Sequence, residues 1–329
     1  MKPDCAVHIN GIDITGKIRD RILSITVNDA AGIKADTVQI ELDDRDNQIA
    51  EPPDGALIAV SLGYKGMPLI PMGIFVLDAI DYSLAPDRIT IRGKSAEFGG
   101  SLKEQKTRNW DNKTIGEIVD TIAGERGLTG KTSDAHRDFL YEYLAQKAES
   151  DLSFLTRIGK THDALVAVKE GTLVFMGRGE GKSAGGFALP QTWVFKNQLM
   201  PGTSVRKNKA TTYKSARAFW HNKKTGQKEA VTIGDGTPMF EITKALASKA
   251  EAERAAKAKL DEEARKSHGI TLQLIGNPMY RAEGQVKVIG LRLSVPIIWS
   301  IKSVAHRFGS GGYTSQIEGE LPKADSGAQ

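Results

Sequence analysis

The order of apolar and polar positions changes twice along this chain of 329 residues. In the first hundred residues, short apolar runs alternate with clusters of turn-forming residues, a pattern typical of antiparallel strands. Asn10-Gly11 separates the first two runs and accepts the positive φ of a tight hairpin turn. We therefore predict a β domain over residues 1–105, with further strands at Ile22–Val27, Thr37–Leu42, Ala56–Leu62, Ile74–Ile80 and Ile89–Arg92.

The middle of the chain has a helical period instead. Thr114 and Glu117 form a capping box ahead of apolar residues spaced by three and four, which predicts a helix. A second short helix is predicted to begin near Ser150, and a hairpin follows it near residues 165–175. These elements indicate a small α/β domain over residues 106–178.

A β pattern returns over residues 179–322, interrupted by one long helix at 248–268. Ser248 and Glu251 cap that helix, and its interior is rich in good helix formers. Its apolar stripe is narrow and consists of small residues and one leucine: Ala252, Ala255, Ala256, Leu260 and Ala264. The predicted fold class is mainly β with α/β, in which two antiparallel β-barrel domains flank the small α/β module. Residues 323–329 are predicted to be a disordered tail.

Residue types that commonly act in catalysis or bind metals and phosphates do not form a recognisable motif in this sequence. Gly177–Ser183 resembles a phosphate-binding loop, but Met176 stands where that loop needs a glycine, so a flexible linker is favoured. The six histidines lack metal-ligand spacing, and His162-Asp163 is expected on a solvated turn. Cys5 is the only cysteine, which excludes an intrachain disulfide. We expect no catalytic residue, no metal and no cofactor, and hence not an enzyme.

Charge is distributed unevenly around the net value of +5. Residues 1–60 carry eleven acids and six bases, whereas residues 201–230 carry eight bases and one acid, Glu229. A basic stretch of this kind occurs at nucleic-acid sites, at contacts with acidic protein surfaces and in solvated loops. No apolar run reaches the roughly 18 residues that a membrane helix needs, so we expect a soluble protein made in the cytoplasm, without membrane insertion.

Three stretches, taken in order, resemble one protein family. They are WDNKTIGEIV at 110–119, ESDLSFLTRI at 149–158 with the hairpin after it, and SKAEAERAA at 248–256 with the strands around Gly284-Gln285, Val304–His306 and Gly312–Thr314. This arrangement resembles the phage late control protein D family, the baseplate hub of contractile tails. It is also similar to the hub portion of VgrG proteins of type VI secretion.

The resemblance covers nearly the whole chain and implies a structural role in the baseplate of a virion tail or tail-like particle. It implies two β domains related to tail-tube subunits, and a homotrimeric ring that adapts the hexameric tail tube to a trimeric central spike. The implied partners are the spike, the tail tube, other baseplate proteins and the tape measure protein. No needle-like repeat follows Glu320, so the spike is expected to be a separate chain.

The uneven charge suggests how neighbouring subunits meet. Our hypothesis is that the basic stretch contacts the acidic 29–54 stretch of the next subunit, which gives orientation more than affinity. The candidate contact residues are Arg206, Lys207, Lys209, Lys214 and Arg217 on the basic side and Asp43, Asp44 and Asp46 on the acidic side.

Two alternatives from other classes stay open. A nucleic-acid-binding β-barrel protein would use the basic 201–230 stretch, but it needs base-stacking aromatic residues, and aromatic residues make up only 6% of the chain. Nucleic acid is therefore not an expected partner. Because acidic residues are numerous, a pair of catalytic carboxylates stays open as the basis of a cell-wall hydrolase.

Overall fold

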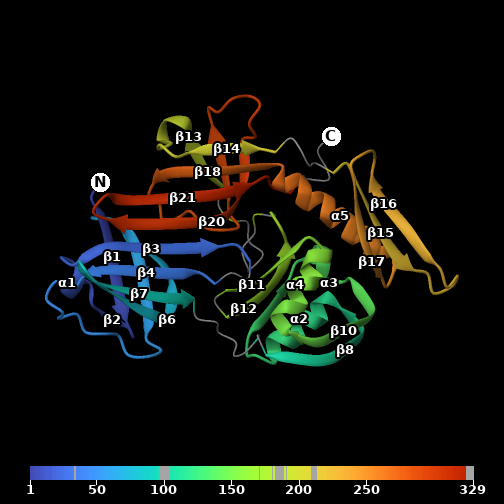
Figure 1. The fold of residues 1–329 in the computed structure, drawn as a ribbon, viewed down its shortest axis with the longest axis horizontal. Helices are drawn as coiled ribbons and strands as arrows, with labels where there is room; N and C mark the ends of the chain where they lie inside the picture. The colour runs from blue at the N-terminus through green and yellow to red at the C-terminus, as the bar shows by residue number, and fades with distance from the viewer. Residues whose placement is uncertain are drawn as a thin grey trace.

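The computed structural model describes residues 1–32, 35–95, 102, 104–169, 171–179, 181, 189, 191–208 and 213–323. Their strands form four sheets, of which the largest has 13 strands (Figure 1). The mainly β fold class predicted from the sequence is confirmed, and most strand pairs in the large sheet are antiparallel.

The N-terminal part of the large sheet uses the apolar runs of the first hundred residues. Its elements are β1 (Pro3–Ile9), β2 (Ile12–Asp13), α1 (Thr15–Ile18), β3 (Ile22–Ala30), β4 (Thr37–Asp43), β5 (Leu57–Tyr64), β6 (Ile70–Leu84) and β7 (Asp87–Ser95). Asn10 and Gly11 have φ of 49° and 81°, as the predicted hairpin turn requires. Alternate side chains of these strands point inward and form one core around Ile40, Val60 and Phe75.

The middle of the chain forms an α/β module with its own core. Its elements are β8 (Gln105–Thr114), α2 (Ile115–Gly124), β9 (Thr129–Thr132), α3 (Asp134–Arg137), β10 (Leu140–Ser150), α4 (Asp151–Thr161), β11 (Ala164–Lys169) and β12 (Thr172–Gly177). The capping box at Thr114 is present, and Ser150 caps α4 through its side chain, so both predicted helices are confirmed. The pairing of β8 with β10 was not predicted from the sequence.

The C-terminal strands complete the large sheet around a core that contains Trp299. These elements are β13 (Gln191–Phe195), the 3₁₀ helix η1 (Lys196–Gln198), β14 (Ser204–Lys207), β18 (His268–Ile275), β19 (Gln285–Ile289), β20 (Ile298–Gly309) and β21 (Gly312–Glu320). Residues Ser303–Gly309 of β20 pair antiparallel with Ser24–Ala30 of β3. The strand order is therefore β14-β18-β21-β20-β3-β4-β7-β6-β5-β1-β2. Strands from the N-terminal and C-terminal parts of the chain thus belong to one sheet.

Within residues 179–322 a second, smaller unit stands apart from the large sheet. Its sheet has the order β16-β15-β17, and the long helix packs on it; the bounds are β15 (Ser215–His221), β16 (Lys228–Gly234), β17 (Met239–Leu246) and α5 (Lys249–Lys266). The helix predicted over 248–268 is confirmed, with Ser248 as its cap. The sequence did not predict that its strand partners form a sheet of their own, and the three domain limits stay a prediction. The last residues of the predicted tail, 324–329, lie outside the described residues.

Candidate functional site: charged surfaces and a central cleft

The acidic candidates lie in and beside the loop that follows β4. Asp46 accepts two hydrogen bonds from Arg21, each 2.5 Å long, and they lower the pKa of Asp46 to about 2. Asp43 pairs with Arg45 at 3.3 Å. Asp44 is only 7% exposed, and its carboxylate accepts a hydrogen bond from a backbone amide of the same loop. Asp44 therefore shapes the loop, whereas the carboxylates of Asp43 and Asp46 stay partly exposed.

The basic candidates lie on two different sheets. Arg206 and Lys207 are exposed on β14, the edge strand of the large sheet. Lys214 is exposed just before β15, and Arg217 lies half-buried on the face of β15 that points away from α5. Lys209 lies outside the described residues. The single basic stretch of the sequence is thus divided between the end of the large sheet and the small sheet.

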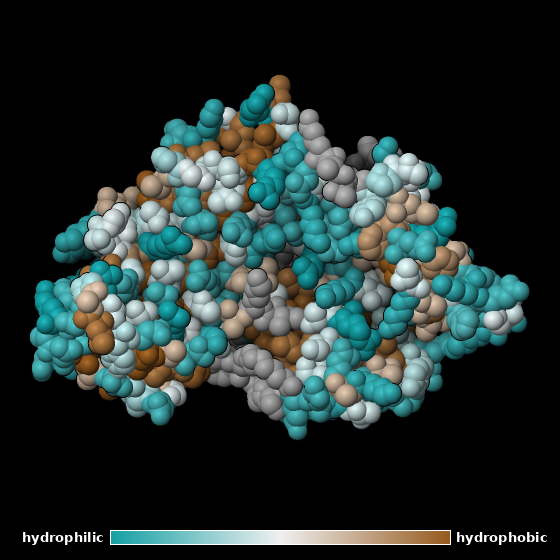
Figure 2. Space-filling view, in the orientation of Figure 1, coloured by the Kyte–Doolittle hydropathy of each residue, from teal (hydrophilic) through white to brown (hydrophobic). Residues whose placement is uncertain are grey.

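The two sets of candidates are not brought together within one chain. The acidic loop lies at the end of the molecule that carries α1, whereas β14 lies along the top of the view beside β18 and β15 lies at the opposite end next to α5 (Figure 1). Hydrophilic side chains also predominate on the surface at the end formed by β15–β17 (Figure 2). A contact between the two sets therefore requires two copies of the chain.

The aromatic residues near the basic stretch are used in packing. The Lys228 ammonium lies 4.0 Å from the centre of the Phe219 ring. Trp220 packs against the core of the small sheet, and Tyr213 contacts Phe240 edge to face. A surface that binds single-stranded nucleic acid presents such rings for base stacking. These contacts weigh against the nucleic-acid alternative.

His162 and Asp163 are buried, so the expectation of a solvated turn was wrong. Each is 5% exposed, and Asp163 receives a hydrogen bond of 2.6 Å from Arg265 of α5. Arg265 also lies 3.5 Å from Glu320 at the end of β21. This buried ion pair joins the α/β module, the long helix and the large sheet. Its two partners are 102 residues apart in the sequence, which is why spacing alone gave no signal.

His162 belongs to a buried aromatic cluster of the α/β module. Its Nε2 atom lies 2.7 Å from the Tyr141 hydroxyl, and its ring contacts Phe139 and His136 edge to face. Its Nδ1 atom is buried and has no hydrogen-bond partner among the described residues. Burial lowers the pKa of His162 to about 3, so the ring is neutral near pH 7.

Asp151 is a further buried acid that the sequence reasoning did not single out. It begins α4, is fully buried, and forms ion pairs with Arg108 at 2.6 Å and Lys106 at 2.9 Å. Burial alone raises the pKa of Asp151, but hydrogen bonds from Gln146 and Lys106 outweigh burial and leave that pKa below its ordinary value. Asp151 stands in the second of the three family-like stretches, and its role here is to fix α4 against β8.

A third buried charge cluster joins the large sheet to the α/β module. Asp29 on β3 pairs with Lys169 on β11 at 3.1 Å and accepts a hydrogen bond of 2.8 Å from the Ala282 backbone. Burial raises the pKa of the nearby Asp36 and Glu283 carboxyls, although Lys169 opposes this effect. In the acidic stretch of the sequence, Asp29 is therefore buried inside the molecule and Asp36 is half-buried.

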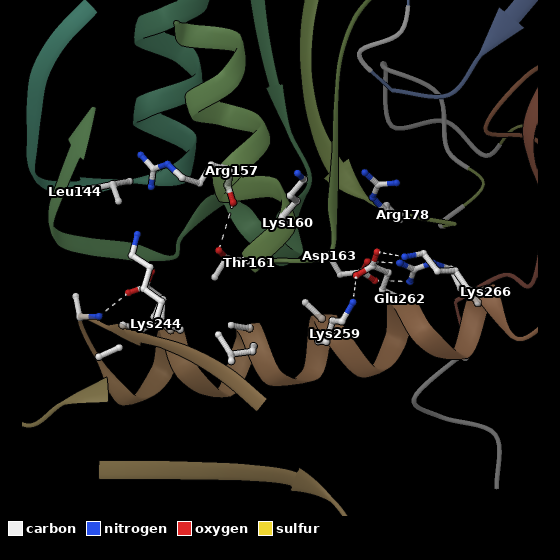
Figure 3. A pocket seen from close by; sticks show the side chains of 18 of the residues that line it. Leu144, Arg157, Lys160, Thr161, Asp163, Arg178, Lys244, Lys259, Glu262 and Lys266 are labelled. Carbon is white, nitrogen blue, oxygen red and sulfur yellow. Dashed lines mark hydrogen bonds and ion pairs between the residues drawn. The ribbon is translucent and has the colours of Figure 1, made fainter. Parts of the chain in front are cut away.

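The space between the α/β module and α5 is a cleft of about 820 Å³. Its walls come from β10, α4 and the end of β12 on one side and from β17 and α5 on the other (Figure 3). Eight lysine and arginine side chains and four acidic side chains line it. None of the described residues of the basic 201–230 stretch lines the cleft, so the charge pattern of the sequence did not point to this site.

Some kinds of site are absent from the described part of the chain. Within it, no group of three or more His, Cys, Asp and Glu side chains is arranged to hold a metal ion. No helix there combines the length and the apolar character needed to cross a membrane.

The described chain is thus built from several β-sheets, and buried ion pairs join its units. The model of the phage tail baseplate hub family (GPD) matches residues 75–311, and the chain belongs to this family. It is thus a baseplate hub protein of a phage tail, a structural component of the virion rather than an enzyme.

Individual relatives agree with this assignment. The chain is 32% identical over 368 residues to the probable baseplate hub protein of Escherichia phage 186, and the match covers 99% of this chain and 94% of that protein. Its identity to the corresponding protein of Escherichia phage P2 is 31%, covering 99% of this chain and 95% of that one.

Solved structures show that the fold is shared more widely. The 43 kDa tail protein of prophage MuSo2 from Shewanella oneidensis superimposes with a TM-score of 0.74 at 14% identity, over 98% of this chain and 99% of that one. A component of the type VI secretion system of E. coli gives a TM-score of 0.57 at 14% identity, over 97% of this chain and 77% of that one. The expected likeness to the hub portion of type VI secretion proteins is therefore confirmed at the level of the fold.

Proposed function

We propose that three copies of this chain close into a ring that adapts the hexameric tail tube to a trimeric central spike. The observation that carries the proposal is the pairing of β3 with β20, which joins two β units with separate cores in one sheet. Three copies then present six β units to a sixfold partner while keeping threefold symmetry toward the spike.

The proposed partners follow from this position in the tail. One face of the ring meets the tail tube and other baseplate proteins, and the tape measure protein is a further partner in the tube. The other face meets the spike. Assembly takes place in the cytoplasm of the bacterial host.

Charge complementarity between copies orients the ring in this proposal. Asp43 and Asp46 have partly exposed carboxylates at one end of the chain, and Arg206, Lys207 and Lys214 are exposed on another side. Contact between unlike surfaces of identical copies is heterologous, and it closes into a ring when the rotation between copies is one third of a turn. Lys209 and Arg217 lie in the same basic stretch and belong to the proposed surface.

The test is the mass of the particle in solution. We expect light scattering after size exclusion to give about three times the 35.6 kDa of one chain, alone or with a candidate spike co-expressed. Negative-stain images of that fraction should contain rings. A monomer under both conditions would contradict ring formation.

A further inference from the structure

The central cleft has more positive charge than its own ion pairs use. Arg265 and Lys266 are paired with Asp163 and Glu262. Three other cations line the cleft, Lys160, Arg178 and Lys244, and their side-chain nitrogens have no hydrogen-bond or ion-pair partner among the residues that the structure describes. Lys160 and Arg178 project from α4 and the end of β12, and Lys244 projects from β17 on the facing wall (Figure 3). Unpaired cations on both walls favour an anionic ligand.

Two strand edges border the same space. Residues 143–145 of β10 and 242–246 of β17 line the cleft. In the described part of the chain, β10 pairs only with β8, and β17 pairs only with β15. On β10, the Ala145 carbonyl accepts a hydrogen bond from Arg157, so it is β17 that offers a free edge. A free edge presents unpaired backbone N–H and C=O groups, which an extended peptide can satisfy by adding as a further strand.

The rest of the lining suits a peptide better than a nucleic acid. Apolar groups of Leu144, Ile242 and Leu246 lie in the walls between the charges. Among the described residues, Tyr143 is the only aromatic one that lines the cleft, whereas a site for single-stranded nucleic acid stacks successive bases on aromatic rings. Apolar contacts, free backbone groups and unpaired cations together match a segment in which acidic and apolar side chains alternate.

We propose that this cleft binds an extended acidic peptide segment of a partner protein. The carboxylates of the segment pair with Lys160, Arg178 and Lys244, and its backbone lies along the free edge of β17. This site is distinct from the subunit contacts of the proposed ring, because none of the candidate contact residues that the structure describes lines it. The proposal therefore goes beyond ring formation and does not depend on it.

The test measures binding of a labelled peptide to the full chain by fluorescence anisotropy at low salt. The probe is a peptide of alternating glutamate and valine, as long as the eight residues of β17. The variant Lys160→Glu/Arg178→Glu/Lys244→Glu reverses the three unpaired charges. The matched control, Lys131→Glu/Lys147→Glu/Lys257→Glu, makes the same charge change at exposed lysines outside the cleft. A thymidine oligonucleotide of the same net charge as the peptide is the second probe.

We expect the control to bind the peptide as the unchanged chain does, and the cleft variant to bind it at least about tenfold more weakly. Circular dichroism checks that both variants fold, and the milder pair Lys160→Gln/Lys244→Gln replaces the cleft variant if that variant does not fold. Three results overturn the proposal: no peptide binding by the unchanged chain, equal loss in cleft and control variants, or an oligonucleotide bound as tightly as the peptide and lost in the cleft variant.

Discussion

Buried histidines link the stability of the molecule to pH. Burial lowers the pKa of His162 to about 3 and that of His306 to about 4, below the ordinary value of 6.5. The unfolded chain therefore binds protons that the folded chain excludes when the pH lies between these values. The stability that the two neutral, buried histidines contribute is fully present above about pH 6.5. It is lost as the pH falls toward their folded-state pKa values.

We expect the unfolding free energy to decrease by about 2 kcal/mol as the pH falls from 7 to 5, because His162 is protonated in the unfolded chain but not in the folded one. The variant His162→Gln keeps a polar partner for Tyr141 and removes the titration, so its stability should depend less on pH. Urea unfolding at several pH values between 7.5 and 5 measures this slope. The control His221→Gln, at the exposed end of β15, should keep the original slope. If His162→Gln also keeps it, the burial argument is wrong.

The long helix packs through its smallest side chains. Ala252 and Ala256 are fully buried against Ala216 and Ala218 of β15, so the helix lies close to the sheet. This contact explains the narrow stripe of small residues in the sequence. A larger side chain there must displace the helix, because the core of this small unit is already filled.

We expect Ala256→Leu to lower the unfolding free energy by about 1–3 kcal/mol. Ala250→Leu makes the same change on the same helix at an exposed position, and its effect should stay within about 0.5 kcal/mol. Denaturant unfolding of the two variants beside the parent chain measures the difference. Equal effects would mean that the helix does not need small residues at its contact with the sheet.

Elements with local signals were predictable, and those held by distant partners were not. Side-chain caps at Thr114, Ser150 and Ser248 mark the three longest helices, because a cap involves residues only three positions apart. β8 and β10 carry many exposed polar residues and lack a clear apolar alternation, so no strand was predicted there.

The candidate sites divide in the same way. Charge asymmetry was visible in the sequence, but the cleft is built from segments near residues 143–178, 242–266, 302 and 320. The buried partners Asp163 and Arg265, and Asp29 and Lys169, are likewise more than a hundred residues apart. Such sites form only when the large sheet, the α/β module and the small sheet with α5 pack together. Local sequence patterns do not predict that packing.

At the scale of the whole molecule, the position of the two charged surfaces gives the last prediction. If the acidic surface of one copy attracts the basic surface of the next, then Arg206→Glu/Lys207→Glu/Lys209→Glu should reduce the fraction of trimer at low salt. Added salt should likewise reduce the fraction of trimer formed by the unchanged chain. The matched control is Lys131→Glu/Lys147→Glu/Lys257→Glu, which makes the same charge change elsewhere and should leave the trimer intact.

A charge exchange makes this test specific for the proposed contact. A chain with Asp43→Lys/Asp46→Lys should lose ring formation, and mixing it with the chain reversed at residues 206, 207 and 209 should not restore a trimer. In the mixture only contacts between unlike variants are favourable, and a ring of three cannot alternate two kinds of subunit. The combined variant, with both sets reversed in every copy, avoids this conflict and should restore the trimer measured by light scattering. A trimer that persists in every variant at low salt would exclude these charges from the contact and leave ring closure to strand edges and apolar surface.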